Sequence, residues 1–126
     1  MAGNVIDADG VGSTQYAGYH LKVPLLVVMG HEGCGAVTAA LEALGGTARE
    51  PRYVEALARR IEPGLKGLDP ALRGDARLSA AVEANVRWSA GQLARLPEGR
   101  KALEDKFLTL VGAVYELKTG RVRFLA

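Results

Sequence analysis

Residues 23–29 read VPLLVVM, and the segment GHEGCG follows directly at residues 30–35. The first run is apolar throughout, and it lacks the alternation of a strand that has one face in water. This pattern predicts a strand buried on both faces, as in a parallel sheet that helices cover. Pro24 is compatible with the beginning of such a strand, because proline cannot donate a ladder hydrogen bond.

Glycine and proline positions divide the rest of the chain into elements. Residues 30–35 predict a tight loop, and a helix should follow from about Cys34 to Leu44, where Gly45 and Gly46 end it. The apolar spacing predicts further helices over residues 51–61, ended by Pro63 and Gly64, and over residues 75–96, ended by Pro97. Residues 62–74 should form a loop with short turns at most, and residues 98–104 one more helical turn.

The two ends of the chain complete the pattern. Residues 1–13 are rich in Gly, Asp and Asn and predict a loop, with Ser13 as the N-cap of a helix over residues 14–21. Residues 107–115 and 121–125 predict strands joined by a turn at 118–120, which makes a C-terminal hairpin. We therefore expect one α/β domain over residues 1–126, with a mostly parallel β-sheet flanked by helices.

Composition and charge exclude several classes of protein. The chain has 126 residues, 48% of them hydrophobic, a formal net charge of +2 and a single cysteine. This charge is too small to indicate a nucleic-acid partner or a membrane surface. No intrachain disulfide can form, and neither a secretory signal nor an apolar run long enough for a bilayer is visible. These features favour a cytoplasmic protein.

His31 and Cys34 form the candidate metal site. They lie at the carboxyl end of the expected buried strand, where open α/β sheets place their functional groups. Imidazole nitrogen and thiolate sulfur are donors that zinc prefers, and glycines between them let both turn toward one point. Gly35 offers a backbone amide at the start of the next helix. The alternative is that Cys34 is a small core residue without a ligand.

The segment GHEGCGAV at residues 30–37 resembles the signature of the β-class carbonic anhydrases, Gly-His-x-x-Cys-Gly-Ala. The resemblance continues in order along the chain. It includes AGNV at residues 2–5, GSTQYA at 12–17, EANV at 83–86 and the strand and hairpin at 111–122.

This resemblance implies a fold, a cofactor and a reaction. Members of that family hold zinc with two cysteines and one histidine, and the zinc-bound hydroxide converts carbon dioxide to bicarbonate. It implies that His31 and Cys34 are zinc ligands and that Gly3 and Asn4 belong to a loop lining the active site.

The sequence also departs from the family pattern. The family's other zinc cysteine lies in a Cys-x-Asp-Ser-Arg motif before the Ala-Gly-Asn loop, and here Met1 directly precedes that loop. We therefore expect a chain truncated at its N-terminus, which lacks one zinc ligand, the catalytic Asp–Arg pair and a central strand. Asp7 and Asp9 are expected to bond the backbone rather than a metal, and His20 to lie on the surface.

A missing central strand would expose apolar surface and an unpaired edge. We therefore expect a homo-oligomer, a dimer or larger, with contacts near Val5, Ile6 and the segment 16–19. Three functions stay open: carbon dioxide hydration, a non-catalytic oligomerising or binding subunit, and hydrolysis of a carbon dioxide analogue such as carbonyl sulfide or carbon disulfide. Efficient catalysis by the chain alone is in doubt, because two ligands hold zinc less tightly than three.

Overall fold

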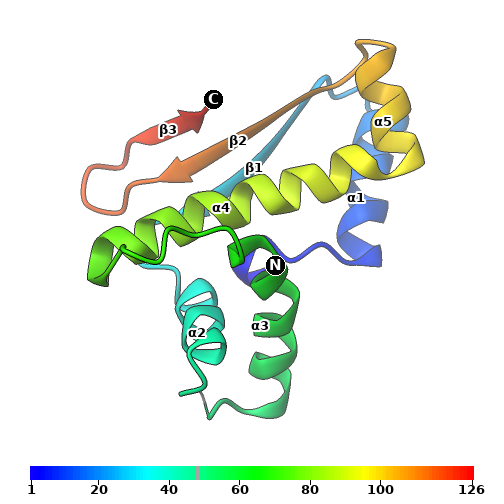
Figure 1. Ribbon diagram of the computed structural model, residues 1–126. Helices are drawn as coiled ribbons and strands as arrows, with labels where there is room; N and C mark the ends of the chain where they lie inside the picture. Colours follow the sequence, from blue (N-terminus) through cyan, green and yellow to red (C-terminus); the bar gives the residue numbers. More distant parts are fainter. Residues whose placement is uncertain (48) are drawn as a thin grey trace.

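The computed structural model describes residues 1–47 and 49–126. Figure 1 shows its helices and strands, which in chain order are η1 (Ala2–Asn4), α1 (Ala8–Tyr19), β1 (Leu25–His31), α2 (Gly35–Leu44), α3 (Arg52–Leu65), α4 (Gly74–Arg95), α5 (Pro97–Glu104), β2 (Thr109–Tyr115) and β3 (Val122–Leu125). The order confirms the α/β class. The predicted helices over 34–44 and 75–96 agree with α2 and α4 to within one residue at each end.

The described residues form one three-stranded sheet in the order β1-β2-β3. β1 and β2 are parallel, with Leu25 opposite Thr109 and His31 opposite Tyr115. β2 and β3 are antiparallel and form the expected C-terminal hairpin. β1 therefore lies at an edge of this sheet, and its last residue is the candidate ligand His31.

The long helix α4 covers one face of the sheet, across which it runs in Figure 1. Val86 is fully buried at this contact. A Cβ added to Gly30 of β1 would lie 2.7 Å from Val86 Cγ2, and one added to Gly112 of β2 would lie 2.9 Å from Val86 Cγ1. The two glycines thus let α4 approach both strands closely.

The opposite face of β1 is open, so the prediction of a strand buried on both faces is wrong. Leu25, Val27 and Met29 are 49%, 37% and 46% exposed, whereas Val28 and Gly30 on the α4 side are buried. The apolar run concealed this alternation because every position in it is hydrophobic, whichever face it occupies. Coverage of a sheet face depends on the elements that pack there, and among the described residues helices pack closely on one face only.

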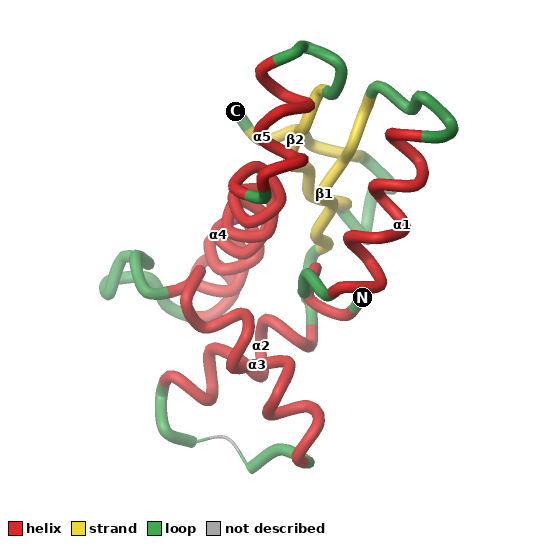
Figure 2. The backbone as a smooth tube through the Cα atoms, turned by 90° about the vertical axis from the view of Figure 1, so that its right-hand side faces the viewer, coloured by secondary structure: helices red, strands yellow, loops and turns green. Residues whose placement is uncertain are grey.

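A second part of the core lies between α2, α3 and the beginning of α4. Figure 2 shows α2 and α3 side by side at one end of the molecule, with α1 beyond β1. The buried side chains there include Val37, Ala40, Ala58, Ile61 and Val82. This cluster includes the candidate ligand Cys34, which directly precedes α2 as its N-cap.

The N-terminal segment is more helical than predicted. Residues 1–13 are not a loop, because η1 and the first half of α1 fall within them, and Ser13 is not an N-cap. Asp7 caps α1 instead, since its side chain accepts a hydrogen bond of 2.7 Å from the Gly10 amide. Ser13 lies inside the helix, where its hydroxyl donates to the Asp9 carbonyl. Asp7 therefore bonds the backbone as expected, but as a helix cap.

The helix α3 does not stop at Pro63 and Gly64, as the sequence predicts, but continues to Leu65. Tertiary contacts explain the extension, because Leu65 is 2% exposed and a Cβ at Gly64 would lie 2.6 Å from the Trp88 Cβ. Burial of this last turn against α4 outweighs the helix-breaking tendency of Pro63.

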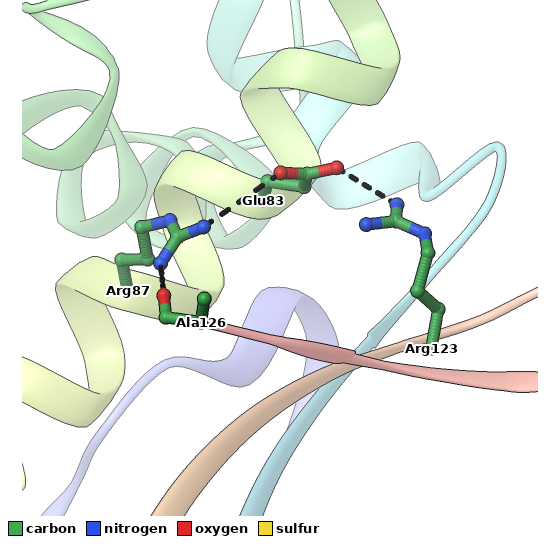
Figure 3. A network of polar contacts seen from close by, with 4 residues as sticks. All are labelled: Glu83, Arg87, Arg123 and Ala126. Atoms are coloured by element: carbon green, nitrogen blue, oxygen red, sulfur yellow. Dashed lines mark hydrogen bonds and ion pairs between the residues drawn. The ribbon is translucent and has the colours of Figure 1, made fainter.

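A polar network ties the C-terminal hairpin to α4 (Figure 3). Glu83 pairs with Arg123 of β3 at 2.7 Å and lies 4.0 Å from Arg87. Arg87 also donates to the carbonyl of Ala126. These charged side chains are 31–52% exposed, so the network contributes modestly to stability. The network aligns β3 along the sheet.

Within residues 1–47 and 49–126, every helix is too short or too polar to cross a lipid bilayer.

Candidate metal centre

The loop between β1 and α2 carries both candidate zinc ligands. His31 is the last residue of β1, and Cys34 is the N-cap of α2. Gly33 between them has φ +64°, a left-handed conformation that glycine adopts without strain. The loop therefore turns sharply from the strand into the helix, as the glycines predict.

The His31 side chain is exposed, and its orientation is set by one hydrogen bond. Nδ1 lies 2.8 Å from the carbonyl oxygen of Glu32. Because a carbonyl oxygen can only accept, Nδ1 carries the proton in this contact. The neutral ring then has its lone pair on Nε2, which is the form that binds a metal through Nε2.

Cys34 is 5% exposed and contacts the core cluster that includes Val5 and Val37. Its carbonyl accepts hydrogen bonds from the Thr38 amide at 3.0 Å and the Thr38 hydroxyl at 3.1 Å. The residue thus begins α2, where the helix dipole favours a negative charge. Gly35, the proposed backbone donor, is the exposed first residue of α2.

The two side chains fit zinc in donor type but not in number. Zinc sites in proteins usually have four ligands, of which at least three are protein groups. Across residues 1–47 and 49–126, no three or more His, Cys, Asp or Glu side chains come together in a way that could hold a metal. The described residues therefore provide at most a His–Cys half-site.

The short 3-10 turn η1 carries Gly3 and Asn4 and is called the Gly3–Asn4 loop below. It is bonded to β1 and α4. The Asn4 side-chain amide donates to the Met29 carbonyl at 2.8 Å, two residues before His31. The Asn85 amide donates to the Gly3 carbonyl at 2.6 Å, and the Ser89 hydroxyl donates to the Asn4 carbonyl at 2.8 Å. The loop therefore lies beside the end of β1 near the candidate ligands. Sequence reasoning did not identify Ser89, although a polar pair four residues apart on an apolar helix face was a usable signal.

Replacing Asn85 with Ala should lower the free energy of unfolding by about 1–3 kcal/mol, because it leaves the buried Gly3 carbonyl without a donor. Chemical denaturation measures the change. Asn85→Leu is the matched variant, since it keeps a similar side-chain volume without charge but removes the donor. A loss below about 0.5 kcal/mol for both variants would be typical of a surface position and would contradict the role of this contact.

Three further polar residues of the N-terminal region stay apart from the His–Cys pair. Asp7 is occupied as the cap of α1, and Asp9 lies exposed in the first turn of that helix. His20 is exposed and stacks near Tyr16, with ring centroids 4.7 Å apart. None of the three belongs to a described cluster of metal-binding groups.

A shallow groove of about 300 Å³ follows the outer side of β1. It lies between the strand and the N-terminal segment, and its lining is mostly apolar, including Val5, Ile6, Val11, Leu26, Val28 and Leu93. Its walls include Asn4 and Met29, so the groove reaches the Gly3–Asn4 loop.

Charged residues with shifted pKa values lie away from this groove. Glu55 raises the pKa of Arg59 on α3, and Asp105 raises the pKa of Lys101 on α5, each through a side-chain hydrogen bond.

The fold and this loop define an α/β protein in which a strand presents histidine and the following helix presents cysteine. Comparison with known proteins gives the family. The profile described as carbonic anhydrase matches residues 1–122, and solved structures of β-carbonic anhydrases share the fold. The chain belongs to the β-class carbonic anhydrase family.

Individual relatives show how much of such a protein the chain spans. It is 38% identical to carbonic anhydrase 2 of Mycobacterium tuberculosis over 125 residues, which cover 95% of this chain and 58% of the relative. A β-carbonic anhydrase of Aspergillus fumigatus superimposes with a TM-score of 0.77 at 27% identity, covering 98% and 71% of the two chains. A tetrameric β-carbonic anhydrase of Sordaria macrospora gives 0.81 at 22% identity, covering 97% and 62%.

Proposed function

We propose that the protein takes part in the zinc-dependent reversible hydration of carbon dioxide to bicarbonate, with His31 and Cys34 as two zinc ligands. The observation that supports this most directly is the hydrogen bond from His31 Nδ1 to the Glu32 carbonyl. It leaves Nε2 available for a metal, and the loop that makes it also places Cys34 at the beginning of α2. Zinc bound there would supply a hydroxide near neutral pH.

The remaining zinc donors must come from outside this pair. The chain spans 58% of the length of the curated relatives, and its described residues offer two ligands. We propose that solvent or protein groups outside the described residues, for example from a second copy of the chain, complete the coordination. Gly3 and Asn4 line the proposed site, and the Gly35 amide is available there as a hydrogen-bond donor.

We further propose that the protein is a homo-oligomer. Apolar side chains on the open face of the sheet support this, because Val122 and Phe124 of β3 are 40% and 64% exposed on the same face as the exposed residues of β1, from which β2 separates them. Tyr16 and Tyr19 are also exposed, at 58% and 74%, as the expected contact region requires. Val5 is not available for such a contact, because it is 6% exposed in the chain's own core.

Metal analysis of the purified protein tests the zinc proposal. We expect zinc bound to the wild-type chain and lost from His31→Ala and Cys34→Ala, with a decrease in affinity larger than the roughly 10–100-fold typical of residues that only support a ligand. His20→Ala is the matched control, since His20 is exposed, stacks on Tyr16 and belongs to no described cluster of metal-binding groups. It should keep its zinc.

A carbon dioxide hydration assay on the zinc-loaded protein tests the reaction. Activity should depend on both His31 and Cys34 and should be unchanged in His20→Ala. Zinc at background level in the wild-type protein, or activity that survives both ligand substitutions, would contradict the proposal.

A further inference from the structure

Glu32 lies between the two candidate ligands, and each of its polar groups has a partner. Its amide donates to the Tyr115 carbonyl at 3.0 Å, which continues the β1–β2 pairing one residue beyond His31. Its carbonyl accepts from His31 Nδ1 at 2.8 Å. Its carboxylate oxygen Oε2 accepts from the Leu117 amide at 3.0 Å. Glu32 thus connects β1, the imidazole and the β2–β3 turn.

The carboxylate contact joins segments that are far apart in the sequence. Leu117 begins the turn of the hairpin. Within this turn the Gly120 amide donates to the Glu116 carbonyl, and the Thr119 hydroxyl donates to the Glu116 side chain. The Leu117 amide is directed to Glu32 instead. A hydrogen bond to a carboxylate is stronger than one to a neutral acceptor. It therefore fastens the His31–Cys34 loop to a closed turn.

Gly33, the next residue, does not itself fix the orientation of the Glu32–Gly33 peptide. Gly33 has φ +64°, and a Cβ added there would have open space around it. The Glu32–Gly33 peptide is therefore free of side-chain packing on its glycine side. Its carbonyl keeps its direction toward Nδ1 because Glu32 is held both through its amide and through its carboxylate.

We propose that Glu32 is a positioning residue for the His31 imidazole: its carboxylate anchors the loop to Leu117, so that its carbonyl selects the Nδ1-protonated tautomer and leaves Nε2 for a ligand. The part of this inference that concerns zinc rests on the proposed function. The part that concerns the tautomer does not, because it describes the metal-free chain.

The metal-free protein tests the tautomer directly. Nitrogen NMR, at a pH where the imidazoles are neutral, should show His31 protonated mainly on Nδ1, with His20 as the internal reference. Glu32→Ala should shift His31 toward the usual mixture of tautomers and should speed hydrogen exchange of the Leu117 amide. Glu32→Gln keeps a side-chain acceptor and should preserve both signals. An unchanged tautomer and unchanged Leu117 exchange in Glu32→Ala would overturn the proposal.

Zinc titration tests the consequence for the metal. Glu32→Ala should weaken zinc binding about ten-fold or more, as expected for a group that orients a ligand, whereas Glu32→Gln should restore most of the affinity. Glu42→Ala, which removes an exposed acid of α2, controls for the lost charge and should bind zinc like the wild type. Equal affinity in Glu32→Ala and the wild type would count against the role of Glu32. Absence of zinc from the wild type would instead count against the proposed function, while the NMR result would still decide the tautomer.

Discussion

Gly3→Ala is expected to lower the free energy of unfolding by about 2–5 kcal/mol. Gly3 has φ +60°, and the left-handed conformation costs an alanine about 1–2 kcal/mol. The added Cβ would overlap Ile61 Cδ1 and lie 3.1 Å from the Ala36 Cβ. Ile61 is fully buried, and forcing an extra carbon into a packed core typically costs about 1–3 kcal/mol. Urea denaturation measures the total decrease in the free energy of unfolding.

A double-mutant cycle separates the two causes. Ile61→Val removes the Cδ1 atom that the new Cβ would overlap, at an expected cost of about 0.5–1.5 kcal/mol on its own. In that background Gly3→Ala should cost less, close to the backbone strain of about 1–2 kcal/mol, because the tightest contact has been removed and the 3.1 Å contact with the Ala36 Cβ remains. Strict additivity of the two substitutions would show that the overlap with Ile61 is not the source of the loss.

Gly30→Val is expected to destabilise the protein by about 3 kcal/mol, at the upper end of the range for overpacking. A Cβ alone at Gly30 would lie 2.7 Å from Val86 Cγ2 and 3.0 Å from Val82 Cγ1. Both valines are buried on α4, and their branched side chains have little rotamer freedom in a helix. The strand must therefore move away from α4, which also displaces His31, the next residue. Thermal and chemical denaturation should both record the loss.

Gly12→Ala is the matched control for this substitution. Gly12 lies inside α1, and a Cβ there would meet no atom within 4 Å. Replacing a glycine in a helix interior by alanine should raise stability by about 0.5–1 kcal/mol. If Gly30→Val unfolds with a free energy within about 1 kcal/mol of the wild type, then β1 is not held against α4 as tightly as the structure shows.

Much of the fold was predictable because it depends on local signals. Gly45 and Pro97 mark the ends of α2 and α4, and the glycine-rich segment after the apolar run correctly predicted a strand, a tight loop and a helix. The placement of His31 at the end of β1 and Cys34 at the start of α2 follows from the same signals. The class of fold and the location of the candidate site could therefore be read from short stretches of sequence.

Other features depended on contacts between distant residues and could not be predicted in this way. An apolar run of residues does not reveal that Val27 and Met29 face outward, because exposure depends on which elements cover the sheet. The local chemistry of proline disfavours a helix, yet α3 continues past Pro63 because Leu65 is buried. Ser13 and Asp7 are both good N-caps, and the choice between them depends on where α1 begins.

The sequence by itself determined the order of elements, the strand–loop–helix that carries His31 and Cys34, and the residue types suited to zinc. These properties reside in neighbouring residues, whose conformations are restricted by glycine, proline and apolar spacing. Only the tertiary structure decided that Asn85 and Ser89 hold the Gly3–Asn4 loop and that Glu32 reaches Leu117, 85 positions along the chain. Such hydrogen bonds form because packing of α4 and the hairpin against β1 brings the partners together, and no local pattern encodes that distance.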